Sequence, residues 1–235
     1  MTITKRVLAA MALCLAMLML CSCGTAATDT EAEQTEAPVT TEATEAPAAT
    51  EAPAATETPA EETEQGEKGQ ITHYAEIDIA DYGTITVALY GNDAPITVAN
   101  FVKLANQGFY NGLTFHRIMS GFMMQGGDPN GNGTGGSDET IKGEFSANGV
   151  ENTLSHTRGA ISMARSSAYD SASSQFFIMH QDYTGLDGMY AVFGYVTDGI
   201  DIVDAICTSA QPTDNNGTIP ADEQPVINSI TVREA

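Results

Sequence analysis

The 235-residue sequence has no tryptophan, four cysteines and only nine lysines and arginines against 31 acidic side chains, for a formal net charge of −22. The deficit of positive charge argues against nucleic acid as a partner, because no basic surface is available to displace phosphate counterions. The uninterrupted apolar run of residues 7–20 is shorter than the ~20 residues that a membrane-spanning helix requires. About a fifth of the chain is too poor in apolar residues to form a core, which leaves one folded domain.

Residues 1–22 are predicted to be a lipoprotein signal peptide. Two basic residues precede the apolar run, which ends in Leu20-Cys21-Ser22-Cys23. This ending resembles a bacterial lipobox, in which a small residue precedes the cysteine that is lipidated, and Cys23 fits that position better than Cys21. An ordinary cleaved secretory signal is the alternative. The resemblance implies an extracytoplasmic protein that is lipid-anchored to the cell membrane, with Cys207 as its one free thiol and no intramolecular disulfide.

Residues 23–70 are predicted to be a disordered linker behind the lipidated cysteine. The segment is almost entirely Ala, Thr, Glu and Pro, with Thr-Glu-Ala-Pro at 35–38, 44–47 and 50–53. Such a composition has too little apolar surface to offset the entropy of ordering, and its prolines and like charges favour an extended chain. We interpret it as a solvated spacer that spans on the order of 40 Å when flexible. An O-glycosylated stalk is the alternative.

Residues 71–235 are predicted to form one domain, with 19 acidic and six basic residues. Apolar alternation over 74–90 indicates a hairpin, and a helix is expected from the capping residue Asp93 to Gly108. Short strand-like segments broken by glycines follow, then a second helix over about 199–209 and a closing strand over 226–232. This pattern is mainly β and favours a barrel or a sandwich.

Three segments of the domain stand out: Phe115-His116-Arg117-Ile118, residues 121–128 (GFMMQGGD) and residues 174–178 (SQFFI). On strand periodicity Phe115 and Arg117 share one face, which places a guanidinium among apolar side chains. From alternation alone, such an arginine is a structural residue that pairs with a carboxylate or carbonyl groups. The neighbouring Phe and Met residues would then be ordinary core.

Together the three segments resemble the cyclophilins, and the resemblance extends over essentially all of residues 72–235. It includes Met163-Ala164, Leu186-Asp187-Gly188 and Val192-Phe193-Gly194. It implies a closed eight-stranded antiparallel barrel capped by two helices, with a peptide groove on the outer face. It also implies a peptidyl-prolyl cis/trans isomerase that acts, without cofactor or metal, on Pro-containing segments. With the predicted export signal, we expect its partners to be unfolded exported proteins, and we expect the protein to be a monomer. A non-catalytic proline-peptide-binding chaperone or adaptor on the same fold is the alternative.

By position, the resemblance makes Arg117 the catalytic arginine and Gln125 the glutamine that holds it. The substrate-binding residues that it implies form the walls of a proline pocket and the backbone-binding groove: Phe122, Met123, Phe177, Leu186 and Tyr190, with Ala164, Arg165 and Gln175. Tyr190 stands where many members have histidine.

Two positions depart from the family pattern. Gly185 falls where many members have a tryptophan that is implicated in binding cyclosporin, so we expect weak inhibition by that compound. Arg165 replaces the usual asparagine, and its added charge is expected to alter the sequence preference near the proline.

The loop at 128–139 also fits the EF-hand calcium pattern, with Asp128 first and Glu139 last. Against this reading, the segment before the loop is strand-like, and Gly135 stands where an apolar anchor is usual. A glycine-rich loop is expected here in cyclophilins. The four histidines show no metal-ligand spacing.

Overall fold

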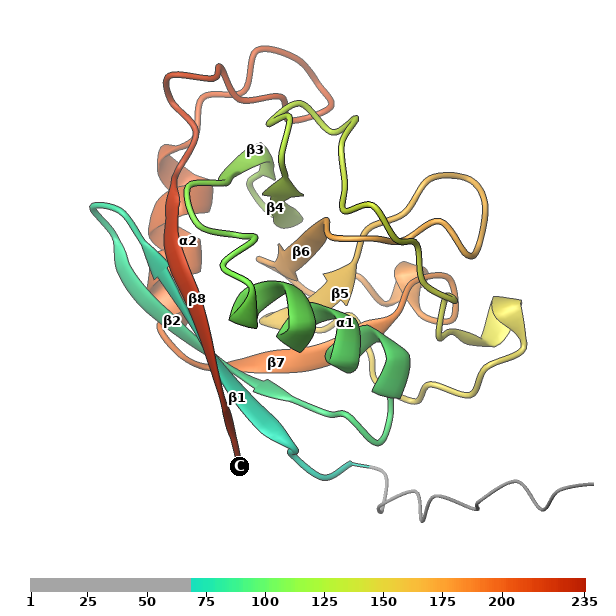
Figure 1. Cartoon of the computed structure of the whole chain (residues 1–235). Helices are drawn as coiled ribbons and strands as arrows, with labels where there is room; N and C mark the ends of the chain where they lie inside the picture. The colour runs from blue at the N-terminus through green and yellow to red at the C-terminus, as the bar shows by residue number, and fades with distance from the viewer. Residues whose placement is uncertain (1–68) are drawn as a thin grey trace, which may run out of the picture. The chain divides into compact units, whose positions relative to one another are not determined.

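The structure, a computed structural model, describes residues 69–235 (Figure 1). The predicted signal peptide, Cys23 and the predicted linker as far as residue 68 lie outside the described residues. Within 69–235, no helix has the length and apolar character needed to cross a membrane.

Eight antiparallel strands form one curled sheet in the order β3-β4-β6-β5-β7-β2-β1-β8. Their bounds are β1 His73–Ile79, β2 Gly83–Leu89, β3 Thr114–Met119, β4 Met123–Asp128, β5 Ala160–Met163, β6 Phe176–Met179, β7 Val192–Asp198 and β8 Ile227–Glu234. The hairpin predicted over 74–90 is the β1–β2 pair. The mainly β architecture was therefore predicted correctly.

The sheet is open, so the prediction of a closed barrel was wrong in that respect. The terminal strands β3 and β8 share no ladder, and an isolated bridge joins Thr114 of β3 to Val226, the residue before β8. Further along β3, the edge is occupied by a different segment: the amide of Ile118 donates to the carbonyl of Gly217 (2.8 Å), and that of Ile219 donates to the carbonyl of His116 (3.0 Å). The loop before β8 thus takes the positions that a closing strand would use.

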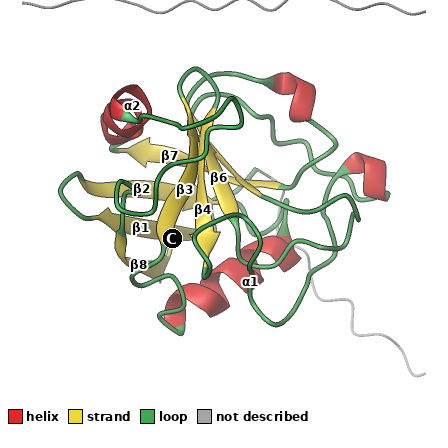
Figure 2. Ribbon diagram, turned by 90° about the horizontal axis from the view of Figure 1, so that it is seen from above, coloured by secondary structure: helices red, strands yellow, loops and turns green. Residues whose placement is uncertain are grey.

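Two helices, α1 (Pro95–Asn106) and α2 (Ile200–Ser209), lie on different sides of the curled sheet in Figure 2. Two short 3-10 helices, η1 (Ser146–Asn148) and η2 (Thr184–Leu186), interrupt the long connections. Gly199 precedes α2 with φ 80°, a left-handed conformation that glycine adopts without steric cost. Both helices match the predicted ranges.

The start of α1 differs from the prediction, because Asp93 does not cap it. The N-cap residue is Ala94, and no side chain next to it bonds the helix. The carboxylate of Glu144 does so from a distant loop: it accepts hydrogen bonds from the amides of Ile96 (3.0 Å) and Thr97 (2.8 Å) and from the Thr97 hydroxyl (2.7 Å). A remote carboxylate therefore satisfies the exposed N–H groups of the first turn.

Asp93 instead fixes the entry of the chain into the domain. Its Oδ2 accepts a hydrogen bond from the amide of Gly69 at 2.8 Å. The other end of the domain lies close by, since the amide of Ala235 donates to the carbonyl of Thr72 at 3.0 Å. Both ends of the described chain are thus tied down beside β1.

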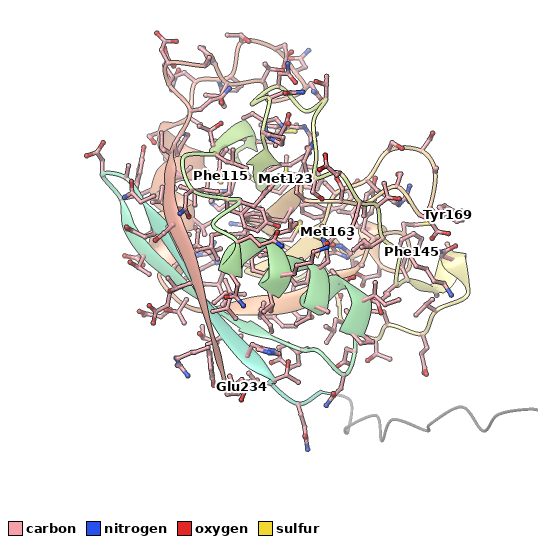
Figure 3. All side chains as sticks on the ribbon, viewed as in Figure 1. Phe115, Met123, Phe145, Met163, Tyr169 and Glu234 are labelled. Carbon is pink, nitrogen blue, oxygen red and sulfur yellow. The ribbon has the colours of Figure 1, made fainter. Side chains whose placement is uncertain are left out.

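The sheet separates two groups of apolar side chains. The larger group packs inside the curl and includes Phe115, which is labelled in Figure 3. In this group the rings of Phe101, Tyr110, Phe115, Phe176 and Phe193 meet one another at centroid distances of 5.2–5.9 Å. The smaller group, on the outer face, holds Met123, Ala160, Phe177, Met179 and Val192. Alternation along β4 and β6 assigns neighbouring residues to opposite faces, so the same strands build the core and the outer site.

Candidate active site

An apolar pocket of about 280 Å³ opens on the outer face of the sheet, next to the smaller apolar cluster. It is lined by nine of the ten predicted catalytic and substrate-binding residues: Arg117, Phe122, Met123, Gln125, Ala164, Arg165, Phe177, Leu186 and Tyr190. The tenth, Gln175, lines a neighbouring pocket together with Gln125. The structure therefore brings together residues that lie up to 73 positions apart in the sequence.

Arg117 reaches this pocket because β3 is irregular. The register with β4 shifts between Phe115 and Arg117, so an extra residue, His116, lies between them. Phe115 faces the inner core, whereas Arg117 faces the outer pocket. The prediction that these two residues share a face was wrong, since strand periodicity holds only without a bulge.

The Arg117 guanidinium is held by neutral partners. Its Nε donates to the carbonyl of Asn216 (2.8 Å), and its Nη1 donates to Oε1 of Gln125 (3.3 Å). It also contacts the sulfurs of Met119 and Met123, at 3.3 and 3.7 Å, and lies over the ring of Phe122, 5.9 Å from its centroid. None of the ion pairs found among residues 69–235 includes Arg117. Its charge is therefore oriented but not neutralised.

Burial lowers the pKa of Arg117, and electrostatic interactions with the Tyr190 hydroxyl and the Asp214 carboxylate oppose that shift. An arginine in a protein remains protonated despite such a shift. The group is therefore a permanent cation whose desolvation strengthens its electrostatic effect on whatever occupies the pocket.

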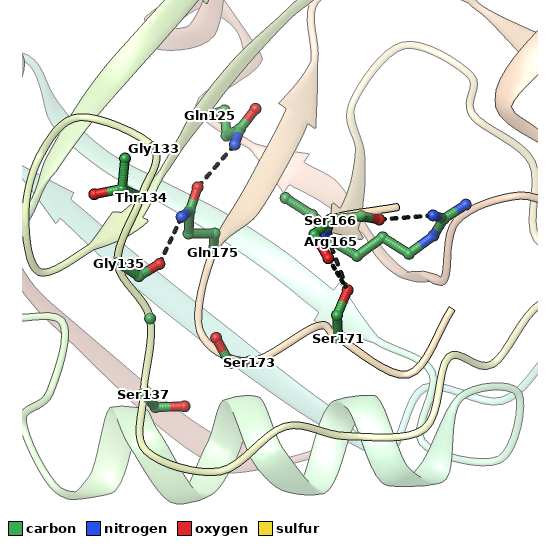
Figure 4. Close-up of a pocket in the computed structure, with 12 residues that line it drawn as sticks. Gln125, Gly133, Thr134, Gly135, Ser137, Arg165, Ser166, Ser171, Ser173 and Gln175 are labelled. Carbon is green, nitrogen blue, oxygen red and sulfur yellow. Dashed lines mark hydrogen bonds between the residues drawn. The ribbon is translucent and has the colours of Figure 1, made fainter. Parts of the chain in front are cut away.

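A row of side-chain amides fixes the position of Gln125 (Figure 4). Its Nε2 donates to Oε1 of Gln175 (2.9 Å), and Nε2 of Gln175 donates in turn to the carbonyl of Gly135 (2.7 Å). This row crosses a second, polar pocket of about 340 Å³ lined by hydroxyl and amide groups and by the 133–137 loop. Because Gln125 is anchored at its amide nitrogen, its oxygen is turned towards Arg117.

The wall of the apolar pocket is supported from behind by His156. Its ring stacks on Phe177 with centroids 5.9 Å apart and an interplanar angle of 14°. The two ring nitrogens contact Oδ1 of Asp187 (2.8 Å) and Oγ of Ser162 (3.0 Å). Burial lowers the pKa of His156, although the hydrogen bond to Asp187 opposes this shift. His156 is a positioning residue that no sequence motif indicated.

Arg165 forms part of the site through a contact that was not expected. Its guanidinium lies over the rings of Tyr190 (4.6 Å), Phe145 (5.0 Å) and Tyr169 (5.1 Å), the last two of which lie together in Figure 3. Its nitrogens donate to the carbonyls of Met189 (2.7 and 3.1 Å) and Ser166 (2.9 Å). In Figure 4 the side chain extends away from the polar pocket. Arg165 thus joins the end of β5 to the segment that carries Tyr190.

The EF-hand reading of the 128–139 loop does not fit the geometry. Both carboxylate oxygens of Asp128 accept backbone N–H bonds from its own loop, from Asn130, Asn132 and Gly133 (2.5–3.0 Å). Glu139 pairs with Lys103 at 2.6 Å. No group of three or more His, Cys, Asp or Glu side chains suited to a metal ion occurs within residues 69–235.

The family profile described as "Cyclophilin type peptidyl-prolyl cis-trans isomerase/CLD" matches residues 74–233. The chain belongs to the cyclophilin family. Over 123 residues, 52% of this cyclophilin and 82% of the relative, it is 50% identical to peptidyl-prolyl cis-trans isomerase B of Bacillus subtilis. Over 137 residues, 57% of the chain and 81% of the relative, it is 46% identical to a peptidyl-prolyl cis-trans isomerase of Helicobacter pylori. Its enzyme class is therefore peptidyl-prolyl cis-trans isomerase.

Among solved structures, this cyclophilin is similar to a Cryptosporidium parvum cyclophilin-type isomerase crystallised in the presence of the dipeptide Ala-Pro. The TM-score is 0.60 at 28% identity, over 69% of this chain and 99% of that one. The expected weak inhibition by cyclosporin stays a prediction.

Proposed function

We propose that this cyclophilin isomerises Xaa-Pro bonds in exported proteins at the outer face of the cell membrane, and that Arg117 stabilises the twisted amide. The observation that carries the proposal is the Arg117 guanidinium, which borders an apolar pocket and has no carboxylate as an ion-pair partner in the described part of the chain. A structural arginine pairs with a carboxylate or with carbonyl groups. In Arg117 only Nε bonds a backbone carbonyl, that of Asn216, whereas the two Nη groups contact Gln125 and the sulfurs of Met119 and Met123 beside the pocket.

The reaction needs no nucleophile and no metal. Rotation about a peptidyl-prolyl bond is slow because amide resonance must be broken, at a barrier of about 18–20 kcal/mol. The enzyme has only to fit the twisted amide better than either planar form. A pocket walled by Phe122, Met123 and Phe177 suits the proline ring, since it offers shape and dryness without competing hydrogen bonds.

Arg117 supplies the group that distinguishes the twisted state. The prolyl nitrogen regains a lone pair as the amide twists, and a guanidinium N–H can then donate to it. Nη1 of Arg117 donates to Gln125, but its contact with the sulfur of Met123 and that of Nη2 with the sulfur of Met119 are weak, so N–H groups remain available to the substrate. One charge-assisted hydrogen bond contributes roughly 1.5–3 kcal/mol, or about one to two decades of rate. The remainder must come from the pocket and from holding the chain on both sides of the proline.

We assign substrate-backbone contacts to the strip formed by Ala164, Arg165 and Gln175. The amide of Ala164 already donates to the carbonyl of Gln175 at 2.9 Å, so Ala164 is not a free donor for the substrate. The polar pocket beside this strip would then receive a neighbouring side chain of the substrate.

Membrane anchoring rests on the sequence around Cys23 and on the spacer that follows it. The test is incorporation of labelled fatty acid into the full chain and into a Cys23→Ala variant expressed in a bacterium. We expect label and membrane fractionation for the wild type, with both lost in the variant. If the wild type and Cys23→Ala were released from the cells equally, and neither carried the fatty-acid label, the ordinary secretory signal would be supported instead.

Catalysis is tested by exchange NMR on a short Ala-Pro peptide with the wild type, Arg117→Ala and the control Arg233→Ala. Arg233 lies on β8 against Tyr74, at 4.4 Å, and does not line the pocket. Only Arg117→Ala should lose most of the exchange enhancement while keeping its circular dichroism spectrum. Near-normal exchange in folded Arg117→Ala would make Arg117 structural. Peptide binding without any exchange in the wild type would favour the adaptor alternative.

A further inference from the structure

Tyr183 is an exposed aromatic side chain at the edge of the proline pocket. It is the most exposed of the large apolar side chains in the described domain, at 53%. Its ring meets that of Phe122 edge-on, with centroids 5.1 Å apart and an interplanar angle of 66°. Since Phe122 lines the pocket, Tyr183 continues the apolar wall of the pocket outwards.

The backbone of Tyr183 is fixed on both sides. Its amide donates to the carbonyl of His156 (2.8 Å), and its own carbonyl accepts a bond from the amide of Leu186 (3.2 Å) as η2 begins. Gly185 leaves room for the ring: a Cβ atom at that position would stand 3.3 Å from Cε1 of Tyr183. A larger residue at 185 would compete with the ring for this space. The Tyr183 ring can therefore occupy its position because residue 185 is a glycine.

Tyr183 and the polar pocket mark opposite ends of the site. Phe122 immediately precedes β4, whereas Gln125 lies three residues further along the chain and pairs with Phe177 of β6. The polar pocket begins at Gln125 and extends to the 133–137 loop (Figure 4). A peptide whose proline occupies the apolar pocket therefore has polar groups on one side and Tyr183 on the other.

We infer that Tyr183 forms an apolar subsite for the residue next to the proline on the side away from the polar pocket, with a preference for aromatic side chains. This inference rests on the proposed function, since it needs a proline peptide in the groove. Aromatic rings prefer edge-to-face or offset contacts, and the exposed side of Tyr183 offers such a contact to a third ring after Phe122. Contact with a substrate ring also removes apolar surface of Tyr183 from water.

The test compares three peptides: a reference with alanine on both sides of a single proline, and two in which phenylalanine directly precedes or directly follows it. Rates come from exchange NMR and dissociation constants from chemical-shift titration. In the wild type, the catalysed exchange rate and the affinity of one phenylalanine peptide should exceed those of the reference peptide by a ratio of about 2 to 10, the size of one aromatic contact. In Tyr183→Ala this ratio should fall to about one, whereas Tyr183→Phe should retain it.

Tyr82 provides the matched control. It is also an exposed tyrosine, at 38%, but it lies in the β1–β2 turn and does not line the proline pocket. Tyr82→Ala should keep the wild-type ratio. A ratio unchanged in Tyr183→Ala, or no preference for either phenylalanine peptide in the wild type, would overturn the inference. Failure of the proposed function has a different signature: the wild type would not accelerate exchange of any peptide, while the dissociation constants would still report the subsite.

Discussion

Oε1 of Gln125 lies 3.3 Å from Nη1 of Arg117 and accepts its hydrogen bond without neutralising its charge. A carboxylate in this place would also accept a hydrogen bond from the guanidinium, but it would lose the bond that Nε2 of Gln125 donates to Gln175. A substitution of Gln125 by glutamate therefore tests how Arg117 acts. If Arg117 only fills space, pairing it with a carboxylate should matter little; if it acts through its charge, pairing should reduce activity.

Replacing Gln125 by glutamate should reduce activity more than replacing it by alanine. Gln125→Ala leaves Arg117 charged but less well oriented, and we expect about a 3- to 10-fold loss of kcat/KM. Gln125→Glu creates an ion pair that competes with the prolyl nitrogen, and we expect at least about another tenfold loss. Exchange NMR on the Ala-Pro peptide measures both. Equal activity of the two variants would show that the charge of Arg117 does not contribute.

Arg165 should act by positioning Tyr190 rather than by attracting charged substrates. Three of its nitrogens donate to backbone carbonyls, and its guanidinium is covered by three aromatic rings. We expect Arg165→Met to raise KM more than it lowers kcat and to lower Tm by a few degrees, in line with about 1–2 kcal/mol for these contacts.

The charge interpretation of Arg165 predicts a different result. Peptides with aspartate or lysine beside the proline would then change their relative kcat/KM in Arg165→Met. From these contacts we expect that ratio to stay within about twofold of the wild-type value; a larger change would instead support the expectation from sequence that the added charge alters substrate preference.

Folding stability should decrease as the pH falls from about 6.5 towards 5. Burial lowers the pKa of His116, an effect that Asp128 opposes and Arg117 reinforces, and burial also lowers the pKa of His156. Below their ordinary pKa of about 6.5, both histidines bind protons in the unfolded chain before they do so in the folded one, so acid favours unfolding. Above about pH 6.5 both histidines are neutral in the folded and in the unfolded chain, so their full contribution to folding stability is present.

Urea unfolding at pH 7.5, 6.5, 5.5 and 5.0 measures this effect. Each histidine contributes at most about 1.4 kcal/mol per pH unit. His116→Gln and His156→Gln should each flatten the curve, and the double variant should flatten it most. The carboxyl groups of Asp128 and Asp187 do not account for the slope, because their pKa values are also lowered and they titrate at more acidic pH. A slope that is unchanged in the double variant would contradict the assignment.

Glu144→Gln should destabilise the domain by about 1–3 kcal/mol. The carboxylate accepts three hydrogen bonds at the start of α1, and an amide in its place presents N–H groups to donors. It also removes a negative charge from the positive end of the helix dipole. Urea unfolding measures the loss. The control is Glu139→Gln, which breaks an exposed pair with Lys103 and should leave stability nearly unchanged.

Sequence reasoning predicted the β1–β2 hairpin, both helices and nine of the residues around the pocket, since these features have local patterns or fixed motif spacing. It could not predict the bulge at His116, because hydrophobic periodicity carries no signal for one extra residue in a strand. Contacts made by irregular segments were also missed. The carbonyl of Asn216 anchors Arg117 from a loop 99 positions away, and any residue type could supply that carbonyl.

The same limit applies to the cap of α1. Asp93 has the right residue type and position for a local cap, but Glu144, from a loop 47–48 positions away, takes that role. The seam between β3 and β8 was likewise invisible in the sequence, since the loop segment that occupies the β3 edge lacks a strand pattern.

The neighbouring ends of the domain have a consequence for its connectivity. Ala235 bonds Thr72, and Gly69 lies three residues before Thr72, a stretch that spans at most about 11 Å. A short loop from residue 235 to residue 69 would join β8 and β1, which are already antiparallel partners, as a hairpin. If new ends were opened in the exposed turn at Asp81 and Tyr82, the pocket would be built by the same strands in a permuted chain. We therefore expect this permuted order of elements to fold to the same site as the order along this chain.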